Sequence, residues 1–287
     1  RPHPPATRSR SGSGAGGATA AYRLACSVSD PSGILLVERG NRYQPLQDFH
    51  DSEIKMINKI YKEGGLQQTR KSTMTIMQGE CLGGSTVVNN AVCFKMPDII
   101  KQLWQNDYGI DLKEIDKEYS ILEEELNIKP LGSKGLNQVV SGIFKDAVKK
   151  YNSSLADNDK LDEHYPVLTN SLNNNGDGNW NLGNKRMRKR SMLETYIPWA
   201  EAKGIKVISN MTAMRFVAGN NRKAESVLLR ANNGLITKVK VRKAVIVAGG
   251  TIASSHFLMR SEIPNLNIGQ RLSCNFAFPV TLDFKEE

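Results

Sequence analysis

Gly12-Ser13-Gly14-Ala15-Gly16-Gly17 is the stretch that decides the fold, because it satisfies the G-x-G-x-x-G pattern of nucleotide-binding turns. It opens into a helix-like run, Ala18 to Val28, which is followed by the apolar strand Ile34 to Val37 and then by Glu38. In that order, the glycines let the backbone approach a pyrophosphate, the helix N-terminus offers N–H groups, and the acid accepts from a ribose hydroxyl. The stretch therefore predicts a dinucleotide-binding α/β unit.

The residues upstream of this turn do not read as the buried strand that should precede it. Arg1 to Arg10 contains three prolines, three arginines and no large apolar residue. A central strand of a parallel sheet needs apolar side chains on both faces and excludes proline. Residues 1–11 are therefore predicted to be an irregular lead, and the first strand of the sheet is expected to be missing.

Composition narrows the classes of function. The chain has 287 residues, 39% of them apolar, and a formal net charge of +10, but no nucleic-acid reading motif accompanies the charge. Its four cysteines show neither a zinc-ligand spacing nor a C-x-x-C dithiol, so no metal is expected. The sequence also lacks an apolar run of the ~20 residues that span a bilayer, and it lacks a secretion signal. We expect no nucleic-acid partner, no transmembrane segment and a cytoplasmic location.

The middle of the chain reads as helices and loops. Apolar residues recur with helical spacing over residues 53–61, 115–126 and 140–151, which predicts packed helices. Residues 170–184 are rich in asparagine and glycine and predict a long irregular loop. The basic tract Lys185 to Arg190 is interpreted as a solvated start of a helix over residues 191–203, because five charges cannot be buried unpaired.

The last third reads as strands. Alternating residues predict strands over 205–209, 213–217, 226–230 and 237–242, and turn signals at 219–221 and 232–234 make this stretch a β-meander. Ala244 to Ala248 then reads as a buried strand, which Gly249-Gly250 and a helix over 252–260 follow. This second strand-turn-helix is expected to return to the same parallel sheet as the first.

A second glycine-rich segment, Gly79 to Asn90, has two interpretations that the residues alone leave open. It can be a structural bend between a sheet and a helix. Alternatively, Gly83-Gly84-Ser85 followed by Asn89 can carry backbone N–H groups past the phosphates or ring edge of a cofactor.

Taken together, the segments resemble a known family. The glycine turn, Ile34-Leu-Leu-Val-Glu-Arg-Gly40, Gly83-Gly-Ser-Thr-Val-Val-Asn89, Ala244-Val-Ile-Val-Ala-Gly-Gly250 and Asn267-Ile-Gly-Gln-Arg-Leu272 occur in the order seen in glucose-methanol-choline oxidoreductases. These are FAD-dependent enzymes that oxidise small-molecule alcohols. The stretches 175–184 and 190–198 look more like the long-chain-alcohol and cholesterol-oxidase side of the family.

The resemblance implies a cofactor, a fold and a set of site residues. It implies FAD on a Rossmann-like parallel sheet of an α/β fold, accompanied by the β-meander and by a helical, loop-rich insertion. The implied domains are an FAD-binding domain formed by residues 12–90 and 205–264, an insertion at 91–204, and the start of a truncated substrate domain at 265–287. The implied cofactor-binding residues are Gly12, Gly14, Gly17 and Gly249 near the diphosphate, Glu38 at the ribose, Arg39 and Ala213 near adenine, and Gly83, Gly84, Ser85 and Asn89 on the flavin side.

No catalytic residue is assigned. In the family a histidine in the C-terminal part removes the alcohol proton, and His3, His50, His164 and His256 match none of those positions. We expect the chain alone to lack turnover, and neither the alcohol nor the electron acceptor follows from the sequence. Two alternatives stay open: a non-catalytic nucleotide-binding or interaction protein, and a Rossmann dehydrogenase that uses NAD.

Overall fold

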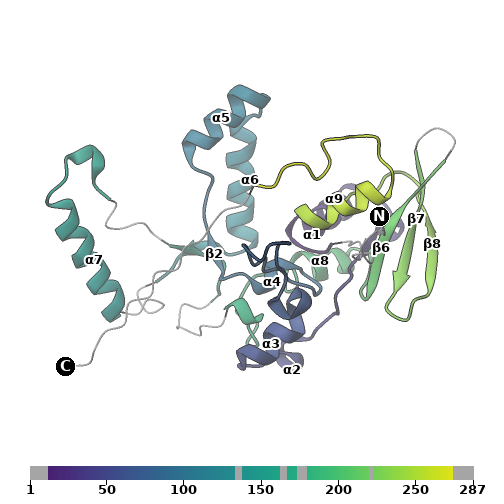
Figure 1. Ribbon diagram of the computed structural model, residues 1–287, viewed down its shortest axis with the longest axis horizontal. Helices are drawn as coiled ribbons and strands as arrows, with labels where there is room; N and C mark the ends of the chain where they lie inside the picture. The colour runs from purple at the N-terminus through teal and green to yellow at the C-terminus, as the bar shows by residue number, and fades with distance from the viewer. Residues whose placement is uncertain (1–11, 133–137, 162–166, 173–179, 220–222, 274–287) are drawn as a thin grey trace.

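The computed structural model describes residues 12–132, 138–161, 167–172, 180–219 and 223–273. It is a mixed α/β structure that contains one parallel pair of strands and two antiparallel sheets. Figure 1 shows the antiparallel meander at one end of the molecule, the helix α7 at the other, and the glycine-rich segments between them. The expected lead over residues 1–11, and with it the question of the first strand, lies outside the described residues.

The predicted order of a helix followed by an apolar strand is confirmed. The helix α1, Ala15–Ser27, precedes the strand β1, Leu35–Val37, which pairs in parallel with β5, Lys206–Ile208. Alanine has the highest helix propensity, and Ala18, Ala21 and Ala25 form a buried stripe of small side chains on α1. These small side chains let α1 approach the helix α8, Tyr196–Ala202, closely.

The prediction of a buried strand at Ala244 to Ala248 is wrong for the described structure. The segment has no hydrogen-bonded strand partner among the described residues, and the Ile246 side chain is 56% exposed. A strand exists only where a neighbour supplies the ladder, and β1 pairs here with β5 alone. The segment still runs beside the first glycine turn, so its place in the fold agrees with the prediction although its hydrogen bonding does not.

The predicted β-meander is confirmed for its last three strands, which carry the last helix, whereas the strand predicted over 205–209 pairs with β1. Its strands are β6, Met211–Ala218, β7, Ala224–Ala231, and β8, Ile236–Lys240, all antiparallel. The helix α9, Thr251–Arg260, packs on this sheet through Phe257. The Phe257 ring lies edge to face against the Phe216 ring, with 4.6 Å between the ring centroids. The backbone N–H of Met211 donates to the Glu38 carbonyl, which ties the meander to the end of β1.

Short helices build the layer around the second glycine segment. They are α2, Pro45–Asp48, α3, Glu53–Ile60, and α4, Ser85–Val88, and their shared core contains Phe49, Met56, Ile60 and Val87. Single 3-10 turns lie at Pro31–Gly33, Lys62–Gly65, Asp157–Asp159 and Trp180–Leu182.

The insertion contains helices and a small sheet. Its helices are α5, Asp98–Tyr108, α6, Leu112–Glu125, and α7, Gln138–Asn152, and its sheet has the order β2, Val92–Cys93, then β4, Leu168–Thr169, then β3, Lys129–Pro130. The expected packing of α6 is confirmed, because Leu122 contacts the main core and Glu125 pairs with Arg23 of α1 at 2.9 Å.

The expectation that α7 is a packed helix is wrong for the described structure. Its helical bounds agree with the prediction, but Val139, Phe144 and Tyr151 are mostly exposed, whereas Val148 is buried. An amphipathic pattern gives the face of a helix that avoids water, but it does not say whether another element covers that face.

Two local expectations around the basic tract are also wrong. The helix predicted over 191–203 begins at Tyr196, because the Glu194 carboxylate accepts from the Ser191 backbone N–H and hydroxyl and holds a turn there. Lys189, expected in solvent, is 1% exposed. Its ammonium group is buried with three backbone carbonyls as hydrogen-bond partners. A run of charged residues does not reveal such partners, because they come from other segments of the chain.

Candidate functional site

The first glycine turn has one tightly packed side and one open side. A Cβ added at Gly12 would lie 2.3 Å from the Ala248 carbonyl oxygen, and one added at Gly17 would lie 2.0 Å from the Gly12 carbonyl oxygen. A Cβ added at Gly14 or Gly16 would meet nothing within 4 Å. The open backbone therefore lies at the first turn of α1, where Gly14 is the N-cap and no side chain caps the helix. Unpartnered N–H groups of this kind attract an anion.

Glu38 follows β1 and lies against the glycine turn. Its side chain is buried, and one carboxylate oxygen, Oε2, accepts from the Ser13 backbone N–H and from the Ser13 hydroxyl, each at 2.8 Å. The other oxygen, Oε1, accepts from the Gly40 N–H at 2.8 Å. Burial raises the pKa of Glu38, and these three donors together with the Arg39 backbone N–H oppose that shift. Four donors of the chain therefore face this carboxylate, which offers about four acceptor positions.

Ser13 joins three parts of the chain. Its hydroxyl donates to Glu38 and accepts from the Gly83 backbone N–H at 2.9 Å, and it is fully buried. We call Ser13, Glu38, Gly40 and Gly83 the Ser13 junction. It fastens the first glycine turn to the end of β1 and to the second glycine segment. Because Ser13 stands at a variable position of G-x-G-x-x-G, the motif gave no reason to single it out.

The second glycine segment packs directly on the first. Gly83 and Gly84 have φ angles of 94° and 55°, in the region that favours glycine. A Cβ on Gly84 would lie 2.9 Å from the Gly14 Cα, so only hydrogen fits between the two turns. The helix α4 follows at once, and the exposed Ser85 accepts from the Gly79 N–H at 3.1 Å. The two predicted cofactor segments are therefore neighbours, although they lie far apart in the sequence.

The structure does not gather all the predicted site residues at one point. Glu38 and Gly83 belong to the Ser13 junction, and Gly12, Gly14, Gly17 and Gly84 lie next to it. The Gly249 Cα lies 3.0 Å from where a Cβ of Gly12 would stand. Arg39 points to the Glu80 carboxylate instead, at 3.0 Å. Ala213 is buried in the meander core with Leu229 and Phe257. Asn89 is exposed at the end of α4, where its side-chain oxygen accepts from the Ala91 N–H.

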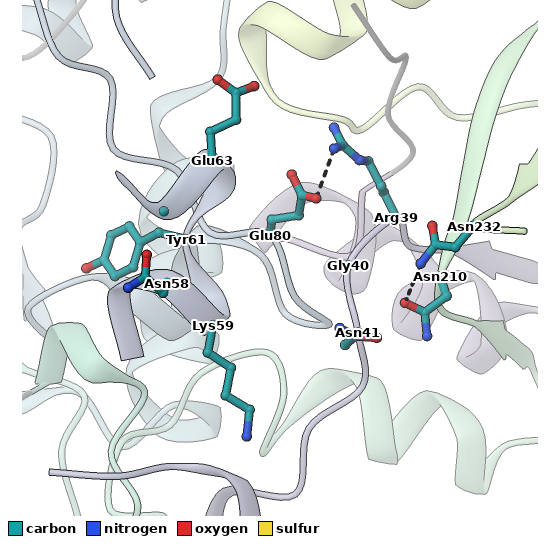
Figure 2. Close-up of a pocket in the computed structure, with 11 residues that line it drawn as sticks. Arg39, Gly40, Asn41, Asn58, Lys59, Tyr61, Glu63, Glu80, Asn210 and Asn232 are labelled. Carbon is teal, nitrogen blue, oxygen red and sulfur yellow. Dashed lines mark hydrogen bonds and ion pairs between the residues drawn. The ribbon is translucent and has the colours of Figure 1, made fainter. Parts of the chain in front are cut away.

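A pocket of about 340 Å³ opens beside the junction, at the ends of β1 and β5. Figure 2 shows its polar lining: Arg39 faces Glu80, and the Asn232 side-chain amide donates to the Asn210 oxygen at 3.2 Å. Gly40, whose N–H holds Glu38, also lines it. Neither Gly12 nor Gly14 lines the pocket. The pocket therefore adjoins the junction on the side of Gly40 and not on the side of the first glycine turn.

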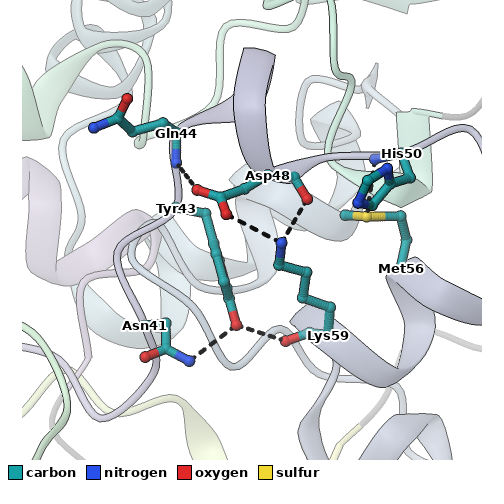
Figure 3. Close-up of polar contacts among 7 residues, drawn as sticks. All are labelled: Asn41, Tyr43, Gln44, Asp48, His50, Met56 and Lys59. Atoms are coloured by element: carbon teal, nitrogen blue, oxygen red, sulfur yellow. Dashed lines mark hydrogen bonds and ion pairs between the residues drawn. The ribbon is translucent and has the colours of Figure 1, made fainter.

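Lys59 lines this pocket, but its ammonium group is already engaged. Its Nζ donates to the Asp48 backbone carbonyl at 2.6 Å and to the Asp48 carboxylate at 3.1 Å. Figure 3 shows this contact together with the Tyr43 hydroxyl, which accepts from Asn41 and donates to the Lys59 carbonyl. The contacts hold the loop before α2 against α3. They give Lys59 a structural role at the pocket wall.

The described residues provide no metal site and no membrane-spanning helix. Among them, no group of three or more histidine, cysteine or acidic side chains is placed to hold a metal ion. Cys26, Cys81 and Cys93 are free thiols, and Cys274 lies outside the described residues. In the described part of the chain, every helix is too short or too polar to cross a bilayer.

Comparisons with known proteins find distant relatives among oxidoreductases. The chain is 27% identical over 272 residues to the long-chain-alcohol oxidase FAO3 of Arabidopsis thaliana, covering 91% of this chain and 35% of that protein. An uncharacterized GMC-type oxidoreductase of Mycobacterium tuberculosis is 25% identical over 257 residues, covering 88% of this chain and 38% of its own length. The chain thus spans about a third of the length of the curated relatives it matches.

Solved structures support the fold. A formate oxidase of Aspergillus oryzae, studied for modification of its FAD, superposes with a TM-score of 0.56 at 14% sequence identity. The superposition covers 88% of this chain and 48% of the oxidase. A family model described as GMC oxidoreductase matches residues 57–277, which is most of the chain. This protein therefore belongs to the GMC oxidoreductase family.

Proposed function

We propose that this chain is the FAD-binding portion of a flavin-dependent oxidoreductase that acts on the CH–OH group of small-molecule alcohols. The observation that carries the proposal is the Ser13 junction. It sets the open N-terminus of α1, the Glu38 carboxylate and the second glycine segment side by side. Membership of the GMC family and the distant likeness to long-chain-alcohol oxidases support the reaction class.

The residues fit FAD in three respects. The backbone N–H groups at the start of α1 suit the negative pyrophosphate, and the Glu38 carboxylate beside them is the acid proposed to accept from a ribose hydroxyl. The absence of a side chain at Gly84 lets the second glycine segment pack directly on the first turn. The predicted contacts of Arg39, Ser85, Asn89, Ala213 and Gly249 remain part of this proposal.

Each part then has a role when the cofactor is present. FAD supplies a hydride acceptor for the carbinol C–H. The α1 N-terminus neutralises the pyrophosphate charge, Glu38 fixes the ribose, and the Gly83 to Asn89 segment supports the flavin end. We assign no residue in the described part of the chain as the base for the alcohol proton.

The purified 287-residue chain is expected to bind FAD and not to oxidise alcohols. Titration with FAD, monitored by quenching of flavin fluorescence, should saturate at one equivalent. Anaerobic addition of a long-chain primary alcohol should leave the flavin absorbance unchanged. Alcohol-dependent bleaching would show that the chain has its own base. Binding of NAD in preference to FAD would favour a dehydrogenase instead.

FAD affinity is expected to rise with pH through the native pKa of Glu38 and then level off. Burial raises that pKa above its ordinary value, so acidification protonates the folded carboxyl and removes the charge that a ribose hydroxyl prefers. The raised pKa makes the stability of the ligand-free chain change with pH in the opposite direction to FAD affinity. The contribution of Glu38 to stability is complete below its ordinary pKa and is lost as the pH rises through its native pKa.

Isothermal titration with FAD across mildly acidic pH measures the change in FAD affinity. Glu38→Gln should show a flat profile, and a flat wild-type profile would refute the assignment.

A further inference from the structure

The basic tract Lys185 to Arg190 contains a buried ammonium group that the proposed function has not yet used. Lys189 is 1% exposed, and its Nζ donates to the carbonyls of Val87, of Asn89 at 2.9 Å and of Trp180 at 2.6 Å. An ammonium group has three donors, so these three acceptors satisfy it completely. Burial lowers the pKa of Lys189 to about 7, and the charge of the neighbouring Glu194 opposes that shift.

The three carbonyls come from two segments. Val87 and Asn89 form the end of α4, on the segment proposed to support the flavin, and Trp180 begins a 3-10 turn in the asparagine-rich part of the chain. The last carbonyls of a helix have no partner within it, so a cation there both satisfies them and stabilises the helix dipole. Lys189 thereby fixes where the Gly83 to Asn89 segment ends.

The residues after Lys189 hold the rest of the same segment. The Met192 N–H donates to the Thr86 hydroxyl at 3.0 Å, and that hydroxyl donates to the Gly83 carbonyl at 2.7 Å. A Cβ on Gly83 would lie 3.1 Å from the Leu193 backbone nitrogen, so the chain packs closely there too. At its other end the segment is held by Ser13 through the Gly83 N–H. The segment is therefore fixed at both ends, by Ser13 and by Lys189.

We propose that Lys189 is a positioning residue for the flavin half of the cofactor, which it affects by holding the Gly83 to Asn89 segment and without touching the cofactor. This inference rests on the proposed FAD function. It separates two tasks: the first glycine turn and Glu38 bind the ADP half, and the segment held by Lys189 supports the flavin half. Loss of the ammonium group should therefore weaken binding of FAD and spare binding of ADP.

Lys189→Met tests this separation, with Lys185→Met as the matched control, because Lys185 belongs to the same tract and is exposed. Affinities for FAD and ADP are measured by calorimetry on the full chain. Amide hydrogen exchange is followed without ligand. Lys189→Met should weaken FAD binding about tenfold, leave ADP binding within about twofold, and speed exchange at residues 83–89 but not in α1. Lys185→Met should match the wild type.

Three results would overturn the inference. The first is equal weakening of FAD and ADP, and the second is an unchanged FAD affinity with a lowered unfolding temperature, which shows a merely structural lysine. The third is a wild-type chain that binds neither FAD nor ADP, which overturns the proposed function as well. If Lys189→Met does not fold, Thr86→Val removes the middle contact of the same segment. It should show the same selective loss of FAD affinity, and equal loss for both ligands would count against the inference.

Discussion

Gly17→Ala is expected to destabilise the chain by about 3 kcal/mol, because its methyl group has no space. The added Cβ would stand 2.0 Å from the Gly12 carbonyl oxygen and 3.3 Å from the Ala248 side chain. The first of these neighbours is backbone, so relief requires that the turn itself moves. That movement would shift Ser13 away from Glu38 and Gly83 and would open the junction. Urea denaturation measures the loss of stability, and FAD titration of the remaining folded protein should show weak binding.

The adjacent position supplies a matched control. Gly16 lies in the same turn of α1, and a Cβ there would meet nothing within 4 Å. Gly16→Ala should therefore gain about 0.5 kcal/mol from the higher helix propensity of alanine. The two substitutions add the same atom to neighbouring residues, so opposite signs isolate the steric effect at Gly17. If both variants were equally stable, the close packing of Gly17 on Gly12 would be wrong.

Local pattern predicts much of this fold. The alanine-rich run after the glycine turn, the alternating strands from 211 to 240 and the helix at 251–260 all form within their own segments. Their periodicity and propensity are properties of neighbouring residues, which a sequence displays directly. Ala244 to Ala248 differs because a strand needs a partner, and the apolar run could not reveal which segment would be its neighbour.

The candidate site divides in the same way. Glycines and Glu38 belong to a known spacing, so the sequence identified them, and the structure brings most of them together. Ser13 and Lys189 had no such signal. The hydroxyl of Ser13 matters because Glu38 and Gly83 arrive from distant segments, and Lys189 is buried because three separate carbonyls converge on it. Both roles arise from tertiary contacts that no local pattern encodes.

Glu38→Ala is expected to lower FAD affinity by about a hundredfold, since it removes the acceptor for the ribose and loosens the junction. The Ser13 and Gly40 N–H groups and the Ser13 hydroxyl lose their shared acceptor together. Buried donors without partners are costly, so the ligand-free chain should also lose about 2 kcal/mol of stability. Calorimetry with FAD and thermal unfolding without it measure the two effects separately.

Glu38→Gln distinguishes the loss of charge from the loss of shape. The amide keeps one oxygen for the two Ser13 donors, but its NH₂ group then faces the Gly40 N–H, and the charged oxygen proposed to accept from the ribose is lost. Stability should fall less than in Glu38→Ala, because the amide oxygen still accepts from the two Ser13 donors, which alanine leaves without this acceptor. FAD affinity should still fall by about tenfold, and ADP affinity should fall equally, because both ligands carry the ribose. A Gln variant that binds both ligands as tightly as the wild type would show that the Glu38 carboxylate takes no part in binding, and Glu38 would then be a structural residue that organises the two glycine turns.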